Sequence, residues 1–166
     1  MRKTISVIFI ILFMISIFGC NFFEQNDVWP YYEAKVIAVI DGDTIKIRFS
    51  NSKPNGCNEV EVVRLIGVNT PELYNPPEYY ANEARDFTNT LWNNPISIEL
   101  DPNFAQRDKY GRLLAYVYHN NLCWNEQIIL EGYGYYYKYF NFDSQRMFIF
   151  NMAEDEAKKN KKGIWK

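Results

Sequence analysis

The sequence predicts an α+β domain built on a small closed β-barrel that carries three helices. Five short segments alternate apolar and polar residues, as half-buried strands do. One helical pattern lies between the third and fourth of these segments, and two more follow the fifth. This order suits the five-stranded OB-fold barrel, and 166 residues with 48% hydrophobic content are enough for one such core.

The five strands are expected at residues 32–40, 43–50, 59–68, 96–100 and 113–118. The second and third of them form a hairpin, because the segment that separates them is polar and contains Gly and Pro. A hairpin brings its two outer ends together, so residues just before the second strand should meet residues just after the third.

The first helix is expected from Asn75-Pro76-Pro77-Glu78 to about Trp92, because its apolar residues recur at steps of three and four. The second is short, from Trp124 to Leu130, and stops at Gly132, where glycine suits a left-handed cap. The third begins at Asp143 or Ser144 and stops at Gly163.

The N-terminus has the pattern of an export signal. Arg2 and Lys3 precede an almost wholly apolar run, which is short for a membrane-spanning helix and ends at Gly19-Cys20. A cysteine in this position resembles the lipidated cysteine of bacterial lipoproteins. We therefore expect a lipoprotein-type signal peptide at residues 1–19, lipidation of Cys20, a tether at 20–31 and the domain at 32–166. An uncleaved N-terminal membrane anchor is the alternative.

Either reading exports the domain and holds it at a bacterial membrane, on the cell surface or the periplasmic face. The formal net charge is −2, and about −4 once Arg2 and Lys3 are removed, so no global basic field favours nucleic-acid binding. Any such binding needs a local basic site. Cys57 and Cys123 are free to form a disulfide after export, although two cysteines do not prove proximity, and no Cys/His spacing indicates zinc.

Oxygen-bearing side chains stand at both ends of the expected hairpin. Asp41 and Asp43 precede its first strand, and Asn69, Thr70 and Glu72 follow its second. Three carboxylates, an amide oxygen and a backbone carbonyl form the oxygen set that hard cations bind, and calcium tolerates irregular geometry better than magnesium does. Each half alone is also an ordinary turn or helix start.

A basic segment lies in the loop between the fourth and fifth strands. Arg112 offers paired donors to phosphate oxygens, Lys109 adds a point charge, and Tyr110 adds a hydroxyl. Arg64, on the hairpin strand, would lie beside the carboxylates. The alternative for the loop is a solvated turn, which is the commoner fate of a charged pentapeptide.

Three motifs in this order resemble those of the micrococcal nuclease, or thermonuclease, family from about Tyr32 to Lys166. They are Asp-Gly-Asp-Thr at 41–44, Arg-Leu-Ile-Gly-Val-Asn-Thr-Pro-Glu at 64–72 and Asp-Lys-Tyr-Gly-Arg at 108–112. The resemblance implies an OB-fold endonuclease that hydrolyses phosphodiester bonds of DNA and/or RNA with calcium.

The resemblance also implies residue roles. Arg64 and Arg112 would stabilise the transition state, and Glu72 would act as general base. Lys109 and Tyr110 would bind the nucleotide's phosphate and sugar. The implied metal site comprises Asp43, Asn69, the Thr70 carbonyl and Asp41.

Two departures from the family pattern stand out. Asn69 replaces an aspartate, so calcium should bind more weakly. The aromatic segment after Gly132 does not align with the family's nucleotide-stacking tyrosines, and Tyr137 and Tyr139 have no assigned role. A catalytically weak or inactive nucleic-acid-binding surface lipoprotein is the alternative function, although a pure binder has no need for Arg64, Glu72 and Arg112 together. We expect a monomer.

Overall fold

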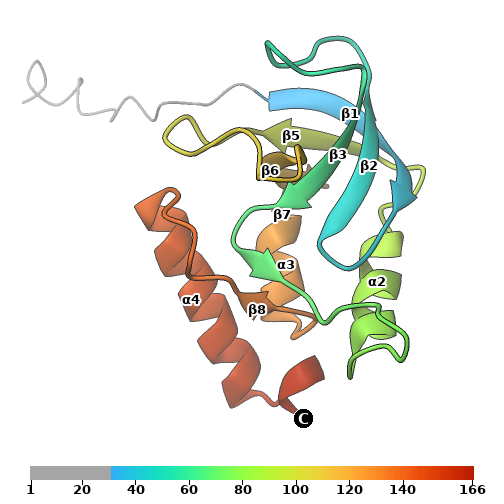
Figure 1. Ribbon diagram of the computed structural model, residues 1–166. Helices are drawn as coiled ribbons and strands as arrows, with labels where there is room; N and C mark the ends of the chain where they lie inside the picture. The colour runs from blue at the N-terminus through green and yellow to red at the C-terminus, as the bar shows by residue number, and fades with distance from the viewer. Residues whose placement is uncertain (1–30) are drawn as a thin grey trace, which may run out of the picture.

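In the computed structural model, which describes residues 31–166, one strongly curved sheet closes into a barrel (Figure 1). Its strands are ordered β3-β2-β1-β5-β6-β7, antiparallel except where β3 also pairs in parallel with β6 and so closes the barrel. Their bounds are β1 (Tyr31–Val39), β2 (Thr44–Phe49), β3 (Val60–Leu65), β5 (Pro95–Glu99), β6 (Leu113–His119) and β7 (Leu122–Cys123). The described part of the chain therefore confirms a closed, mixed five-stranded barrel of OB type.

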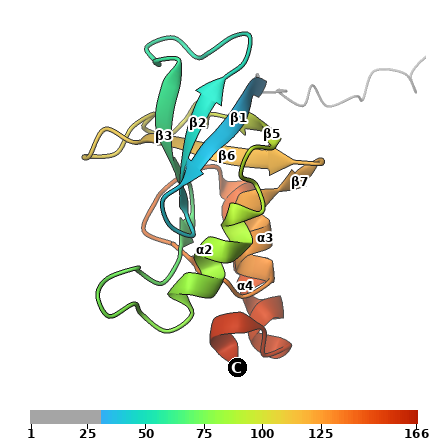
Figure 2. The same ribbon diagram turned by 90° about the vertical axis from the view of Figure 1, so that its right-hand side faces the viewer.

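The helices lie beneath the barrel, at the end opposite the β2–β3 turn (Figures 1 and 2). A two-stranded ribbon accompanies them. The remaining elements are β4 (Val68–Asn69), α2 (Ala81–Asn89), α3 (Trp124–Leu130), β8 (Tyr135–Tyr136), α4 (Ser144–Lys159) and the 3-10 turn η1 (Gly163–Trp165). As predicted, α2 lies between the hairpin and the fourth barrel strand, and α3 and α4 follow the fifth.

The interior of the barrel follows from strand alternation. Along β2, Ile45, Ile47 and Phe49 are buried, whereas Lys46 and Arg48 point to solvent. The core is extended by the buried side chain of Asn125 on α3. Its amide nitrogen donates to the Ile66 carbonyl at 2.9 Å and its oxygen accepts from the Val117 amide at 2.9 Å. Asn125 thus joins α3 to the barrel at the point where the chain leaves β3.

Several element boundaries differ from the sequence prediction, and two of these differences have a clear physical reason. The first helix begins at Ala81, not at Asn75, because Tyr80 adopts a left-handed conformation with φ of 71° and Pro76 and Pro77 cannot donate backbone hydrogen bonds. The third strand ends at Leu65 rather than residue 68. Gly67, with φ of 73°, turns the chain there into β4, which pairs with β8 instead of continuing the barrel.

Cys57 and Cys123 are both free, so the disulfide left open by the sequence is not formed. No helix between residues 31 and 166 is both long and apolar enough to cross a bilayer. The expected signal peptide, Cys20 and nearly all of the tether fall outside the described residues and stay predictions.

Candidate active site

The two ends of the β2–β3 hairpin meet, as its alternation predicted. Thr44 lies opposite Arg64 in the pairing register, and the Leu65 amide donates to the Asp43 carbonyl at 2.9 Å. Gly42 is required at this junction, because a Cβ there would lie 2.7 Å from Thr70 Cγ2 and 2.9 Å from Ala84 Cβ. The turn before β2 is therefore packed directly against the residues after β4 and against α2.

Asp43 is the most deeply buried acid that lines the site and is only 5% exposed. Its Oδ2 accepts from the Thr70 amide at 2.9 Å and forms an ion pair with Arg64 Nη1 at 2.5 Å. Its Oδ1 accepts from Thr44 Oγ1 at 3.1 Å. Burial and the neighbouring Asp41 carboxylate nevertheless raise the pKa of Asp43 to about 7, against the attraction of Arg64. A further positive charge beside Asp43 would favour its ionised form.

Arg64 reaches the same oxygens from β3. It is 8% exposed, and its Nη2 donates to Asn69 Oδ1 at 3.3 Å while its Nη1 pairs with Asp43. The guanidinium therefore spans two of the side chains that the sequence assigned to a metal site.

Arg112 approaches from the loop between β5 and β6. Its Nε donates to Asp108 Oδ2 at 2.7 Å, and its Nη1 donates to Thr44 Oγ1 at 3.4 Å. Because Thr44 in turn donates to Asp43, a continuous polar chain runs from Arg112 to Arg64. The Arg112 guanidinium also lies 5.4 Å from the centre of the exposed Tyr110 ring.

The loop that carries Arg112 is anchored to the barrel by Arg107. Its two terminal nitrogens bind the two carboxylate oxygens of Glu61 on β3 at 2.9 and 2.8 Å. This paired contact lowers the pKa of Glu61 mainly through the hydrogen bonds from Arg107. Arg107 thus has a structural partner that the sequence did not reveal.

Glu72 is held by its backbone in the segment that precedes α2. Its amide donates to Glu78 Oε2 at 2.8 Å, and the Glu78 amide donates back to the Glu72 carbonyl at 3.0 Å. This reciprocal pair closes the loop between them, which projects from the body of the molecule (Figure 2).

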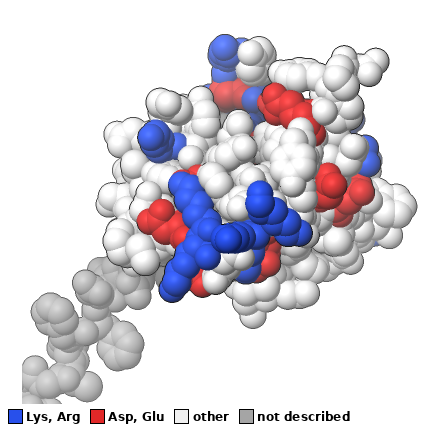
Figure 3. Space-filling view, turned by 90° about the horizontal axis from the view of Figure 1, so that it is seen from below, with Lys and Arg blue, Asp and Glu red and all other residues white. Residues whose placement is uncertain are grey.

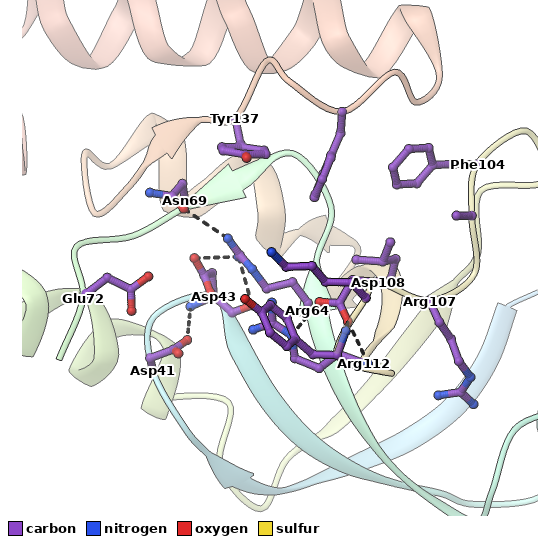
Figure 4. Close-up of a pocket in the computed structure, with 15 residues that line it drawn as sticks. Asp41, Asp43, Arg64, Asn69, Glu72, Phe104, Arg107, Asp108, Arg112 and Tyr137 are labelled. Atoms are coloured by element: carbon purple, nitrogen blue, oxygen red, sulfur yellow. Dashed lines mark hydrogen bonds and ion pairs between the residues drawn. The ribbon is translucent and has the colours of Figure 1, made fainter. Parts of the chain in front are cut away.

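One cavity of about 540 Å³ collects these groups (Figure 4). The sequence-predicted residues that line it are Asp41, Asp43, Arg64, Asn69, Glu72, Lys109, Tyr110 and Arg112. Thr70 does not line the cavity, and its side chain is buried while its amide holds Asp43. The side chains that sequence analysis left without a role here are Phe104, Ala105, Arg107, Asp108, Leu114, Tyr137 and Phe140.

Tyr137 and Phe140 form an aromatic wall of this cavity. Their ring centres are 4.8 Å apart, and Phe104 lies 5.3 Å from Phe140. The Tyr137 amide donates to the Gly67 carbonyl at 2.9 Å, which places the tyrosine beside β4. Alternation of side chains along β8 could have indicated that Tyr137 faces the cavity, but a strand of two residues is too short to be recognised from sequence.

A family model described as staphylococcal nuclease homologue matches residues 62–166, a range that contains Arg64, Asn69, Glu72 and Arg112. The chain belongs to the staphylococcal nuclease family. This confirms the resemblance drawn from the three motifs.

Relatives in this nuclease family cover the part of the chain before residue 62 as well. The thermonuclease of Staphylococcus hyicus is 32% identical over 99% of this chain and 99% of its own length. The thermonuclease of Staphylococcus intermedius is 37% identical over 76% of this chain and 72% of its own. The endonuclease YncB of Bacillus subtilis is 34% identical over 76% of this chain and 58% of its own.

Proposed function

We propose that this protein is a metal-dependent nuclease that hydrolyses phosphodiester bonds of DNA and/or RNA. The observation that carries the proposal is that Arg64 and Arg112 line one cavity together with Glu72 and the aspartate pair. The relatives named as thermonucleases and as an endonuclease support a nuclease rather than another activity.

The proposed chemistry follows from the charge that builds up during hydrolysis. Attack on a phosphodiester increases negative charge on an already anionic group, and fixed guanidinium groups stabilise that charge. Arg112 lines the cavity, and the contacts of Arg64 with Asp43 and Asn69 fix the orientation of its guanidinium group. Glu72 would accept the proton of the attacking water, a contribution typically worth roughly 10²–10⁴-fold.

Lys109 and Tyr110 stand at the cavity's solvent side. Lys109 Nζ lies 4.9 Å from the centre of the Tyr110 ring, and both side chains are exposed. An ammonium and a phenol in this position suit a second phosphate and the sugar of the bound nucleotide. They would bind substrate and take no part in proton transfer.

The donor set fits calcium in type. Asp41, Asp43 and Asn69 supply carboxylate and amide oxygens. Burial first, and the Asp41 carboxylate second, raise the pKa of Asp43, and a bound cation would favour its ionised form. Within residues 31–166, however, no three Asp, Glu, His or Cys side chains lie close enough together to hold a metal ion by themselves, so other oxygen ligands, water among them, would have to contribute. A bound divalent ion would neutralise developing phosphate charge.

The deciding experiment is incubation of the full-length chain with plasmid DNA and with RNA, in calcium and in excess chelator. We expect cleavage in calcium and its loss in chelator. Binding that weakens with salt but yields no cleavage in calcium would instead select the inactive nucleic-acid-binding alternative.

A further inference from the structure

The face of the β4–β8 ribbon that carries Asn69 continues beyond the cavity. Asn69 and Tyr135 are directly paired across the ribbon, so their side chains leave on the same side. Tyr137, two residues further along, also leaves on that side and lines the cavity. Tyr136 points the other way and packs against Phe142 and Phe150. Tyr135 therefore extends the cavity's aromatic wall, and it is 40% exposed.

Beyond Tyr135, the same surface runs into the C-terminal segment. The Tyr135 ring meets the Trp165 ring edge to face, with centres 5.3 Å apart, and Lys158 Nζ lies 4.7 Å from the centre of Trp165. The segment is fixed in place, because the Ile164 amide donates to the Gly132 carbonyl at 2.9 Å. Aromatic and cationic side chains thus alternate along one rigid surface.

Lysines surround this surface at the end of α4. Figure 3, which shows this end of the molecule, has Lys and Arg side chains gathered there beside a few acidic ones. Lys158 pairs with Glu154 at 2.6 Å and Lys162 with Glu131 at 2.9 Å. Lys159 and Lys161 are exposed and make no ion pair with any residue of the described range 31–166. Their ammonium groups are therefore available to phosphates.

We propose that the nucleic-acid strand leaving the catalytic cavity continues along β8 onto Tyr135 and the α4 lysines, which form a second binding subsite. Resting on the proposed nuclease function, this subsite stacks a base on Tyr135 and neutralises backbone phosphates with Lys159 and Lys161. Interleaved aromatic and basic side chains bind single strands in this way, with little sequence preference. The subsite adds affinity only for substrates long enough to reach it.

The test uses the full-length Glu72→Gln chain in calcium, in which cleavage is slowed so that binding can be measured, and compares a dinucleotide with a single-stranded oligonucleotide of about 12 nucleotides. A Lys159→Gln/Lys161→Gln pair is expected to weaken binding of the long oligonucleotide about tenfold at ~0.1 M salt. It should also reduce the slope of log affinity against log salt by about 1.4. Dinucleotide affinity should not change.

One matched double variant controls this result, and two Tyr135 variants test the stacking. Lys35→Gln/Lys46→Gln removes two exposed lysines from β1 and β2, on the barrel away from the ribbon, and should leave both affinities unchanged. Tyr135→Leu keeps apolar packing on Trp165 but loses base stacking. It should weaken the long oligonucleotide roughly 5- to 100-fold, and Tyr135→Phe should restore binding. Thermal unfolding and dinucleotide binding show whether each variant keeps its fold and cavity.

The outcomes separate this proposal from the nuclease proposal. A parent chain that neither binds nor cleaves nucleic acid overturns the nuclease function. A parent that cleaves but binds the long oligonucleotide no better than the dinucleotide overturns the subsite alone. Equal effects of the Lys159/Lys161 and Lys35/Lys46 pairs would likewise show that the lysines act only through net charge.

Discussion

Replacing Arg112 by alanine is expected to lower turnover about 10²–10³-fold at saturating calcium while the domain stays folded. The side chain reaches the cavity from a loop, and its partners Asp108 and Thr44 are themselves hydrogen-bonded elsewhere. Its loss therefore removes transition-state stabilisation without emptying the core. The measurement is the cleavage rate of an oligonucleotide, with circular dichroism as a check on folding.

Two further variants sharpen the Arg112 test. Arg112→Lys keeps the charge but loses the planar pair of donors, so it should recover only part of the rate. Arg48→Ala removes an exposed arginine on β2, whose partner Glu59 is also exposed, and should cleave at the parent rate. If Arg112→Ala also cleaved at that rate, the role assigned to this arginine would be refuted. Arg64→Ala should be as inactive, although its buried contacts make folding a necessary check.

Glu72→Gln is expected to reduce kcat by roughly 10²–10⁴-fold with little change in KM. The amide has the shape of the carboxylate but cannot take a proton from water. The backbone contacts to Glu78 do not involve the Glu72 side chain, so the loop should keep its conformation. Initial rates over a range of substrate concentrations separate kcat from KM.

The matched control for Glu72 is Glu83→Gln, an exposed glutamate in the first turn of α2. It removes the same charge from a residue that does not line the cavity and should retain the parent kcat. A Glu72→Gln chain with the parent kcat would show that Glu72 is not the general base. If the parent and both variants lost activity together on further purification, the cleavage would come from a contaminating nuclease.

The site could be predicted where it depends on local chain order. The alternation of β2 and β3 was enough to bring Asp43 and Arg64 together, because hairpin pairing is short in sequence. Arg112, 48 positions after Arg64, was assigned to the site because its motif resembles that of the nuclease family. No local pattern shows that its loop folds back to Thr44. That contact depends on the parallel pairing of β3 with β6 and on the Arg107–Glu61 anchor, which are both long-range.

The features that the sequence did not predict lie in or beside elements that are too short to show a hydrophobic period. β4 and β8 have two residues each, so neither the aromatic wall at Tyr137 nor the exposed face at Tyr135 could be assigned from alternation. The start of α2 was set by Tyr80 in a left-handed conformation, which apolar spacing does not encode. Tertiary contacts decide both cases.

The central claim is that one cavity binds a cation and a phosphate together, and a linkage measurement tests it most directly. Calcium is titrated calorimetrically into the Glu72→Gln chain with and without a saturating short oligonucleotide. We expect calcium to bind about 5- to 150-fold more tightly with the oligonucleotide present, and the oligonucleotide to gain the same factor from calcium. Identical calcium affinities in the two titrations would contradict a shared site.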